Sequence, residues 1–172
     1  ITASTIAASN ASFSALYAFG ASSNSIVQSV LSNPLGSVVY LSTNSNSNVI
    51  LGAVMRNGAV GRGTLYLTGA SSNTIGQSVI VNSVGRAVSI INGSNFNAIN
   101  LSTMTGPSAG EPAFHIKSAS FNAVSQSYVA NLGGDAFNLD TNADWNSVSQ
   151  STIVSNSAAH QALLLSGASS NT

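Results

Sequence analysis

Apolar residues recur at fixed distances from a repeating asparagine. An aliphatic residue follows each of the first six asparagines by two positions, and an aliphatic residue or methionine follows it by seven. The asparagines lie alternately 24 and 25 residues apart, at Asn24, Asn48, Asn73, Asn97, Asn122, Asn146 and Asn171. The apolar positions are Ile26, Ile50, Ile75, Ile99, Val124 and Val148, then Leu31, Met55, Ile80, Met104, Val129 and Ile153. Self-similarity at this period indicates a solenoid with these columns stacked in its core.

A second polar column precedes a bend in each repeat. Its members are Asn33, Asn57, Asn82, Asn131 and Asn156, and the bend is marked by Gly36, Gly61, Gly85, Gly110 and Gly134, with Ala159 in the last copy. Asparagine tolerates the left-handed backbone region and glycine adopts it freely, so both suit sharp corners. Identical amides stacked one strand spacing apart can also hydrogen-bond to each other, which would satisfy a buried polar column.

The segments between the corners have the composition of short strands. Residues 38–41, 64–67 and 87–91 are rich in β-branched residues and are bounded by Gly, Ser and Asn. No window has a helical period with caps, and 24 or 25 residues minus the corners leave room for three short strands. The chain is therefore predicted to be all-β, a single parallel β-helix of about seven rungs, a rung being one turn of the solenoid.

Alternate rungs differ slightly. The distance from the glycine column to the last inward aliphatic residue is five in one type, as in Gly36 to Leu41, and six in the other, as in Gly61 to Leu67. The motif Ala-Ser-Ser-Asn recurs at multiples of 49 residues, at residues 21–24, 70–73 and 168–171. The true sequence unit is therefore a pair of rungs.

The pattern N-x-I-x-x-S-x-I-x-N-x-x-G, legible at residues 73–85, extends over the whole chain. It resembles the right-handed parallel β-helices of the pectin-lyase-like fold, specifically the Asn/Ser/Gly-rich repeats of bacterial surface and secreted proteins. The resemblance implies a right-handed winding. It leaves function open, because that fold carries lyases, hydrolases, epimerases, adhesins and inert stalks.

Composition excludes several functions. The 172 residues include four basic and four acidic residues, no cysteine and a formal net charge of zero. Four scattered cations cannot form a nucleic-acid surface, and no apolar run is long enough to span a membrane. Without cysteine there is no thiolate zinc site or cysteine nucleophile, and we expect no metal or cofactor. A surface of Ser, Asn, Thr and Ala with little charge repulsion favours assembly, which we expect outside the cell or at its surface.

The first and last residues of the sequence also lead to a prediction. The chain begins just after an expected asparagine and stops one residue after Asn171, and neither end has an atypical polar capping repeat. Residues 1–172 are therefore predicted to be one β-helix solenoid, either a segment of a longer rod or a subunit whose ends stack on neighbours.

One candidate site is the corner position after the glycine column, occupied by Ser37, Arg62, Arg86, Glu111, Asp135 and His160. Rungs lie about 4.8 Å apart, so Arg86 should face Glu111, and Glu111 should face Asp135. Two carboxylates at that distance suit a retaining glycosidase or half of a calcium site. The favoured interpretation is a solvent-facing corner with Arg86 neutralising Glu111.

A second candidate is aromatic. Phe96, Phe121 and Trp145 immediately precede the asparagine in three consecutive rungs and should form a stacked stripe. Such a stripe could bind a sugar face or the backbone of a partner, although mutual packing of the rings is the favoured interpretation.

A third candidate places Lys117 over Asp140, with Tyr40 and Tyr66 in the column that contains His115 and Asn138. His115 lies between Phe114 and Ile116, which alternation assigns to the core, so His115 is expected to face solvent. An isolated histidine is weak evidence for metal binding or acid–base chemistry.

Two functions follow. The first is a structural or adhesive module, a rod of about 34 Å in a filament, stalk or adhesin, able to associate end to end. The alternative is a polysaccharide lyase or glycoside hydrolase with Glu111, Asp135 and Asp140 as its acids. Ice binding is a weaker third possibility, because no column repeats Thr-x-Thr.

Overall fold

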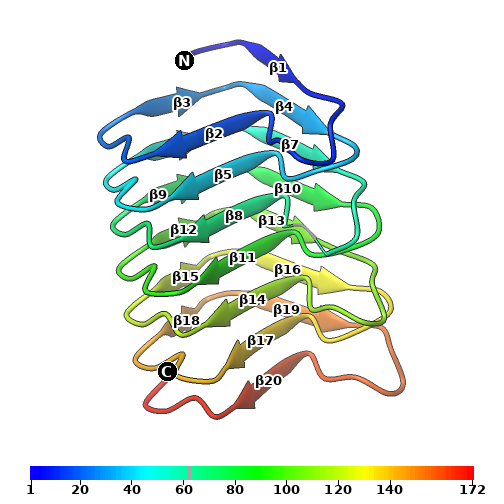
Figure 1. The fold of residues 1–172 in the computed structure, drawn as a ribbon. Helices are drawn as coiled ribbons and strands as arrows, with labels where there is room; N and C mark the ends of the chain where they lie inside the picture. The colour runs from blue at the N-terminus through cyan, green and yellow to red at the C-terminus, as the bar shows by residue number, and fades with distance from the viewer. Residues whose placement is uncertain (62) are drawn as a thin grey trace.

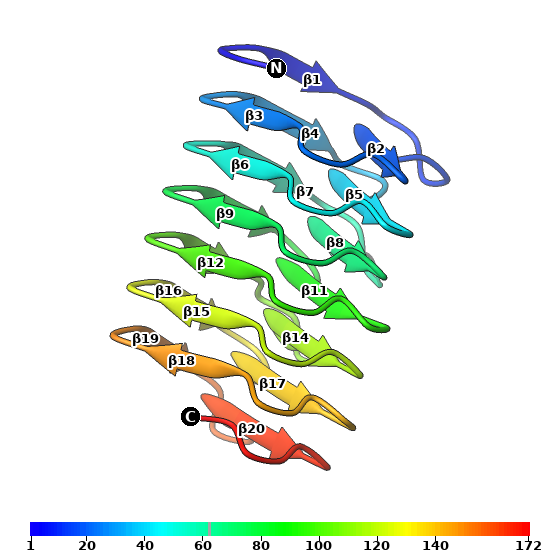
Figure 2. The same cartoon turned by 90° about the vertical axis from the view of Figure 1, so that its left-hand side faces the viewer.

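The computed structural model describes residues 1–61 and 63–172, where the chain forms strands β1 to β20 and no helix. Arg62, a member of the predicted corner column, lies outside the described residues. Three strands and three corners make each full rung, and the rungs stack along one axis from the N-terminus to the C-terminus (Figures 1 and 2). The fold is a single right-handed parallel β-helix of about seven rungs, as predicted.

Every strand pairs in parallel with strands of the neighbouring rungs, which gives three sheets. The first sheet contains β1 (Thr5–Ala7), β4 (Val30–Asn33), β7 (Val54–Asn57), β10 (Val79–Asn82), β13 (Thr103–Thr105), β16 (Tyr128–Asn131) and β19 (Thr152–Ser155). The second contains β2 (Leu16–Phe19), β5 (Val39–Ser42), β8 (Leu65–Thr68), β11 (Val88–Ile91), β14 (Phe114–Lys117), β17 (Phe137–Asp140) and β20 (Leu163–Ser166). The third contains β3 (Ser25–Val27), β6 (Val49–Leu51), β9 (Thr74–Gly76), β12 (Ala98–Asn100), β15 (Ala123–Ser125) and β18 (Ser147–Ser149).

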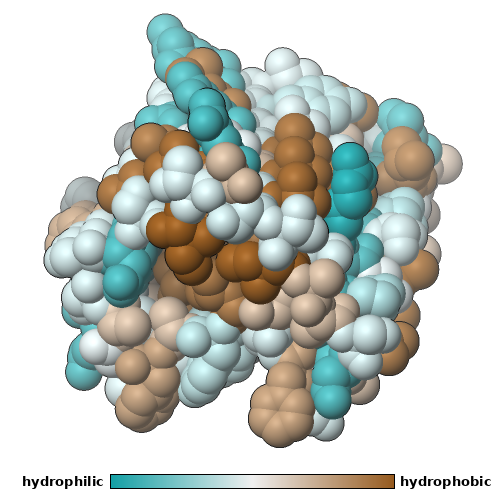
Figure 3. All heavy atoms as spheres, turned by 90° about the horizontal axis from the view of Figure 1, so that it is seen from above, coloured by the Kyte–Doolittle hydropathy of each residue, from teal (hydrophilic) through white to brown (hydrophobic). Residues whose placement is uncertain are grey.

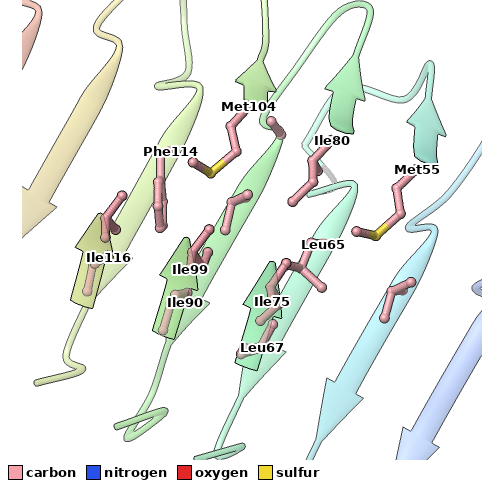
Figure 4. Packing of buried hydrophobic residues seen from close by; sticks show 14 of the residues in the cluster. Met55, Leu65, Leu67, Ile75, Ile80, Ile90, Ile99, Met104, Phe114 and Ile116 are labelled. Atoms are coloured by element: carbon pink, nitrogen blue, oxygen red, sulfur yellow. The ribbon is translucent and has the colours of Figure 1, made fainter. Parts of the chain in front are cut away.

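The sequence columns are the registered rows of these sheets. Ile75 pairs with Ile50 on one side and Ile99 on the other, while Ile80 pairs with Met55 and Met104. These side chains fill the centre of the solenoid, where Figure 4 shows them pointing inward from all three sheets. The predicted core columns are thus confirmed, and the three strands predicted at 38–41, 64–67 and 87–91 each begin one residue later, as β5, β8 and β11.

The first asparagine column forms the predicted amide ladder. Asn73 donates to Asn97 Oδ1 twice, from its backbone N–H at 2.9 Å and from Nδ2 at 3.0 Å. Asn97 makes the same pair of bonds to Asn122, and its Nδ2 also donates to the carbonyl of Ala70 at 3.0 Å. Each buried amide therefore satisfies its neighbour, which explains why the residue type does not vary.

The second asparagine column works differently. Asn131 Nδ2 donates to three carbonyls, those of Ser108, Glu111 and Asp135, at 2.8 to 3.0 Å. Its Oδ1 accepts the backbone N–H groups of residues 133 and 134. One side chain thus fastens its own corner to the corner of the preceding rung. In the fifth rung, directly after β13, Gly106 takes this place, because a Cβ there would collide with the carbonyl of Gly85.

Two further ladders were not predicted. In one, the hydroxyls of Ser78, Ser102, Ser127 and Ser151 each accept a backbone N–H from the preceding rung, at 3.1 Å. In the other, at the outer edge of the asparagine corner, serine alternates with Asn or Asp through residues 22, 46, 71, 95, 120, 144 and 169. Asn95 N–H donates to Ser71 Oγ at 3.1 Å, and Ser120 N–H donates to Asn95 Oδ1 at 2.7 Å. This alternation repeats every two rungs.

Candidate functional site

A cleft of about 330 Å³ lies on the outer face of the second sheet. Its floor is a row of outward side chains on successive strands. Two of them are His115 of β14 and Asn138 of β17, which are register partners. Its wall is the corner segment 109–112. The other lining residues are Arg86, Lys117, Asp135, Asp140 and His160. The cleft therefore gathers both histidines, two of the four basic residues and three of the four acidic residues of the chain.

Each carboxylate in the cleft has a basic partner. Arg86 Nη2 lies 3.5 Å from Glu111 Oε1, as the corner column predicted. Lys117 Nζ donates to Asp140 Oδ2 at 2.9 Å, which confirms the third candidate pair. His160 Nδ1 lies 3.4 Å from Asp135 Oδ1, and the backbone N–H of Gln161 donates to the same oxygen at 2.8 Å. The carboxylates are thus held in place by local contacts.

The prediction that His115 faces solvent is wrong. Its side chain points to the outer face of the sheet, as alternation requires, but only 8% of the residue is exposed. Arg86, Lys117 and Asp140 surround it, and its Nε2 lies 3.4 Å from Asp140 Oδ2. Long side chains from neighbouring rungs therefore bury a position that the strand pattern assigns to water.

Burial lowers the pKa of His115 below its ordinary 6.5, and the positive charge of Arg86 lowers it further, while Asp140 opposes both effects. The hydrogen bond from Lys117 holds the pKa of Asp140 well below its usual 3.8, with help from the backbone N–H and hydroxyl of Thr141. Near neutral pH the floor of the cleft thus pairs an uncharged imidazole with an ionised carboxylate.

This pair predicts a pH dependence of stability. In the unfolded chain His115 gains a proton as the pH falls through 6.5, whereas in the folded protein it stays neutral to a lower pH. The contribution of neutral His115 to the stability of the folded protein is fully present above pH 6.5, and it is lost as the pH falls toward the pKa of His115 in the folded state. We expect the melting temperature of the wild type to drop more steeply than that of His115→Gln between about pH 6.5 and pH 5. Equal slopes in the wild type and His115→Gln would contradict the assignment.

The aromatic stripe is a stack. The rings of Phe96 and Phe121 are 5.0 Å apart at 7°, and those of Phe121 and Trp145 are 6.4 Å apart at 8°. Phe96 and Trp145 therefore stack on the Phe121 ring and partly cover it. The three residues are 60%, 48% and 60% exposed, and all have positive φ of 58° or 59°. An L-residue in this conformation costs about 1–2 kcal/mol.

Serine can replace the stacked rings at little backbone cost. Ser23, Ser47, Ser72 and Ser170 occupy the equivalent positions with positive φ. Phe121→Ser removes two ring contacts and should lower the free energy of unfolding by about 1–2 kcal/mol, whereas Phe96→Ser removes one and should cost about half as much. Urea unfolding of the two variants tests this, and equal costs would show that ring stacking is not the source.

A second aromatic column lies above the cleft on the outer face of the second sheet. Tyr17, Tyr40 and Tyr66 occupy successive outward positions, with ring centroids 5.2 and 5.0 Å apart. The next outward residues along the sheet are Ser89, His115 and Asn138, so the predicted column is confirmed.

No three His, Asp or Glu side chains among the described residues form a group that could hold a metal ion. That part of the chain also contains no helix of the length and apolarity needed to cross a membrane. Comparison of the sequence and structure with protein-family models, curated proteins and solved structures gives no match. The class of the protein is therefore defined by its fold alone: it is a parallel β-solenoid with buried asparagine and serine ladders.

Proposed function

We propose that this solenoid is a structural or adhesive module of an extracellular or cell-surface filament, stalk or adhesin. The observation that carries the proposal is the continuity of its ladders. The asparagine ladder links every rung from Asn24 to Asn171 with side-chain and backbone hydrogen bonds. A column that is satisfied at every step gives a stiff rod, which is the property that a stalk requires.

The end rungs support association. In the described residues β1 and β2 at one end, and β19 and β20 at the other, each have a sheet neighbour on one side only. The first rung is open to a hollow of about 610 Å³ lined mainly by apolar residues, including Leu16, Ala18 and Ile26. Figure 3 shows the apolar side chains in this hollow, seen from the N-terminal end. A further rung, such as the last rung of a second copy, would pair the open strands and cover the hollow.

One mismatch limits this stacking. Rung types alternate, and joining the last rung to the first of another copy would place two long rungs together. The alternation therefore favours joints in which a long rung meets a short one. The resemblance to the Asn/Ser/Gly-rich β-helices of bacterial surfaces also supports the proposed role at the cell surface.

Sedimentation velocity at several protein concentrations tests assembly, with electron microscopy to record particle shape. Elongated species that lengthen with concentration are expected. A monomer at every concentration, with no binding to cell surfaces or matrix, would count against the proposal.

A second candidate is cleavage of a polysaccharide in the cleft. It is favoured by one observation, that Glu111, Asp135 and Asp140 all line this cleft beside a buried histidine. Uronans and neutral glycans should be screened for cleavage, and any activity should then be compared in Asp135→Asn. Absence of turnover on all of them removes this candidate.

A further inference from the structure

The buried polar atoms that lack hydrogen-bond partners are concentrated at the cleft. In the described part of the chain they are Arg86 Nε, Ser89 Oγ, His115 Nδ1 and Asn138 Oδ1. Ser89, His115 and Asn138 are register partners on β11, β14 and β17, and Arg86 lies in the corner before β11. Arg86, His115 and Asn138 also line the cleft. Buried polar groups are almost always paired, so three exceptions lining one cleft point to a ligand that binds there.

The type of hydrogen bond that each atom can form restricts the ligand. His115 Nε2 faces the carboxylate of Asp140, so that nitrogen carries the proton and Nδ1 is an acceptor. Asn138 Oδ1 is also an acceptor, whereas Arg86 Nε can only donate. A ligand that completes this set must both donate and accept, as hydroxyl groups do.

The charges around the cleft restrict the ligand further. An anion would satisfy Arg86 but would meet the carboxylates of Glu111, Asp135 and Asp140. A cation would meet Arg86 and Lys117, and it could satisfy only the acceptors. The carboxylates already have basic partners, so an uncharged ligand leaves the charges of the cleft balanced. The volume of the cleft falls within the range of small-molecule sites.

We propose that this cleft binds a neutral saccharide, with His115 and Asn138 accepting hydroxyl protons and Arg86 donating to a hydroxyl oxygen. This rests on the adhesive function proposed above and deepens it, because it names the ligand and places it in the cleft and not on the stripe of Phe96, Phe121 and Trp145. The unpartnered atoms lie just beneath the surface. Arg86 and Lys117, which have long side chains, are the groups that must shift for the ligand to enter.

Titration calorimetry with trisaccharides of different charge tests the ligand class. The neutral probes are galactotriose, maltotriose and cellotriose, the anionic probe is trigalacturonate and the cationic probe is the glucosamine trimer. At least one neutral probe should bind, and both charged probes should bind more weakly. The proposal is overturned if no neutral probe binds, or if a charged probe binds as tightly as the best neutral one.

Two variants locate the site. Asn138→Leu removes an acceptor with little change of shape and should weaken binding of the neutral probe by about tenfold or more. Its melting temperature should not fall, because an unpaired buried oxygen is removed, so lost binding cannot be ascribed to misfolding. Trp145→Ala should retain wild-type affinity. Wild-type affinity in Asn138→Leu, or loss of binding only in Trp145→Ala, overturns the proposal. Sedimentation of the wild type reports on rod assembly independently of any of these results.

Discussion

Asn97→Ala is expected to lower the free energy of unfolding by about 3–4 kcal/mol. Asn97 is 1% exposed and lies in the middle of the ladder. Its Oδ1 accepts two hydrogen bonds from Asn73, and its Nδ2 donates to Asn122 Oδ1 and to the carbonyl of Ala70. Alanine removes the side chain and leaves these partners buried without water, which costs far more than the small net gain from a hydrogen bond at the surface.

Asn24→Ala is the matched control, since Asn24 belongs to the same ladder but is exposed in the first full rung. Its side chain donates to Asn48 Oδ1 and to the carbonyl of Ser22, and water can replace both bonds. Its expected cost is below about 1 kcal/mol. Urea unfolding of both variants gives the comparison, and a similar cost for the two would refute burial of the ladder as the source of its stability.

Gly106→Ala is expected to lower the free energy of unfolding by about 2–3 kcal/mol. A Cβ on Gly106 would overlap the carbonyl oxygen of Gly85 and lie 3.3 Å from its carbonyl carbon and 3.5 Å from Ala113 Cα. All of these are backbone atoms, held by the stacking of successive corners. No side chain can rotate away, so the corners themselves must separate.

Gly110→Ala tests whether this cost is specific. Gly110 is four residues further along the same corner, a Cβ there would meet nothing within 4 Å, and its φ lies outside the left-handed region. The expected change is within about 0.5 kcal/mol of zero. Thermal or urea unfolding that ranked Gly110→Ala as the more damaging of the two would show that the corner does not pack as described.

The asparagine ladder could be predicted from the sequence because its hydrogen bonds require the same residue at the same position of successive rungs. An amide that must donate to and accept from its counterparts cannot be exchanged, so Asn73 and Asn97 stand out at a fixed spacing. The core columns are legible for a related reason, since each inward position meets the same position in the next rung.

Features that depend on different residues in adjacent rungs were missed. The outer ladder alternates Ser71 with Asn95, so no single residue type marks its column. The burial of His115 depends on long side chains of other rungs, Arg86 among them, which alternation along one strand does not reveal. The charged corner column was visible in the sequence. That this column shares one cleft with Lys117 and Asp140 could be seen only from the positions of the side chains.

The alternating outer edge limits how such a rod changes in length. The inner serines of this edge, Ser71 and Ser120, each lie between two longer Asn or Asp side chains, and each of those lies between two serines. Excising one rung would place two serines, or two Asn or Asp residues, in adjacent rungs and would break the alternation of contacts along this edge. Duplication or loss of whole rung pairs preserves every contact, so growth and shortening of the rod should proceed in even steps.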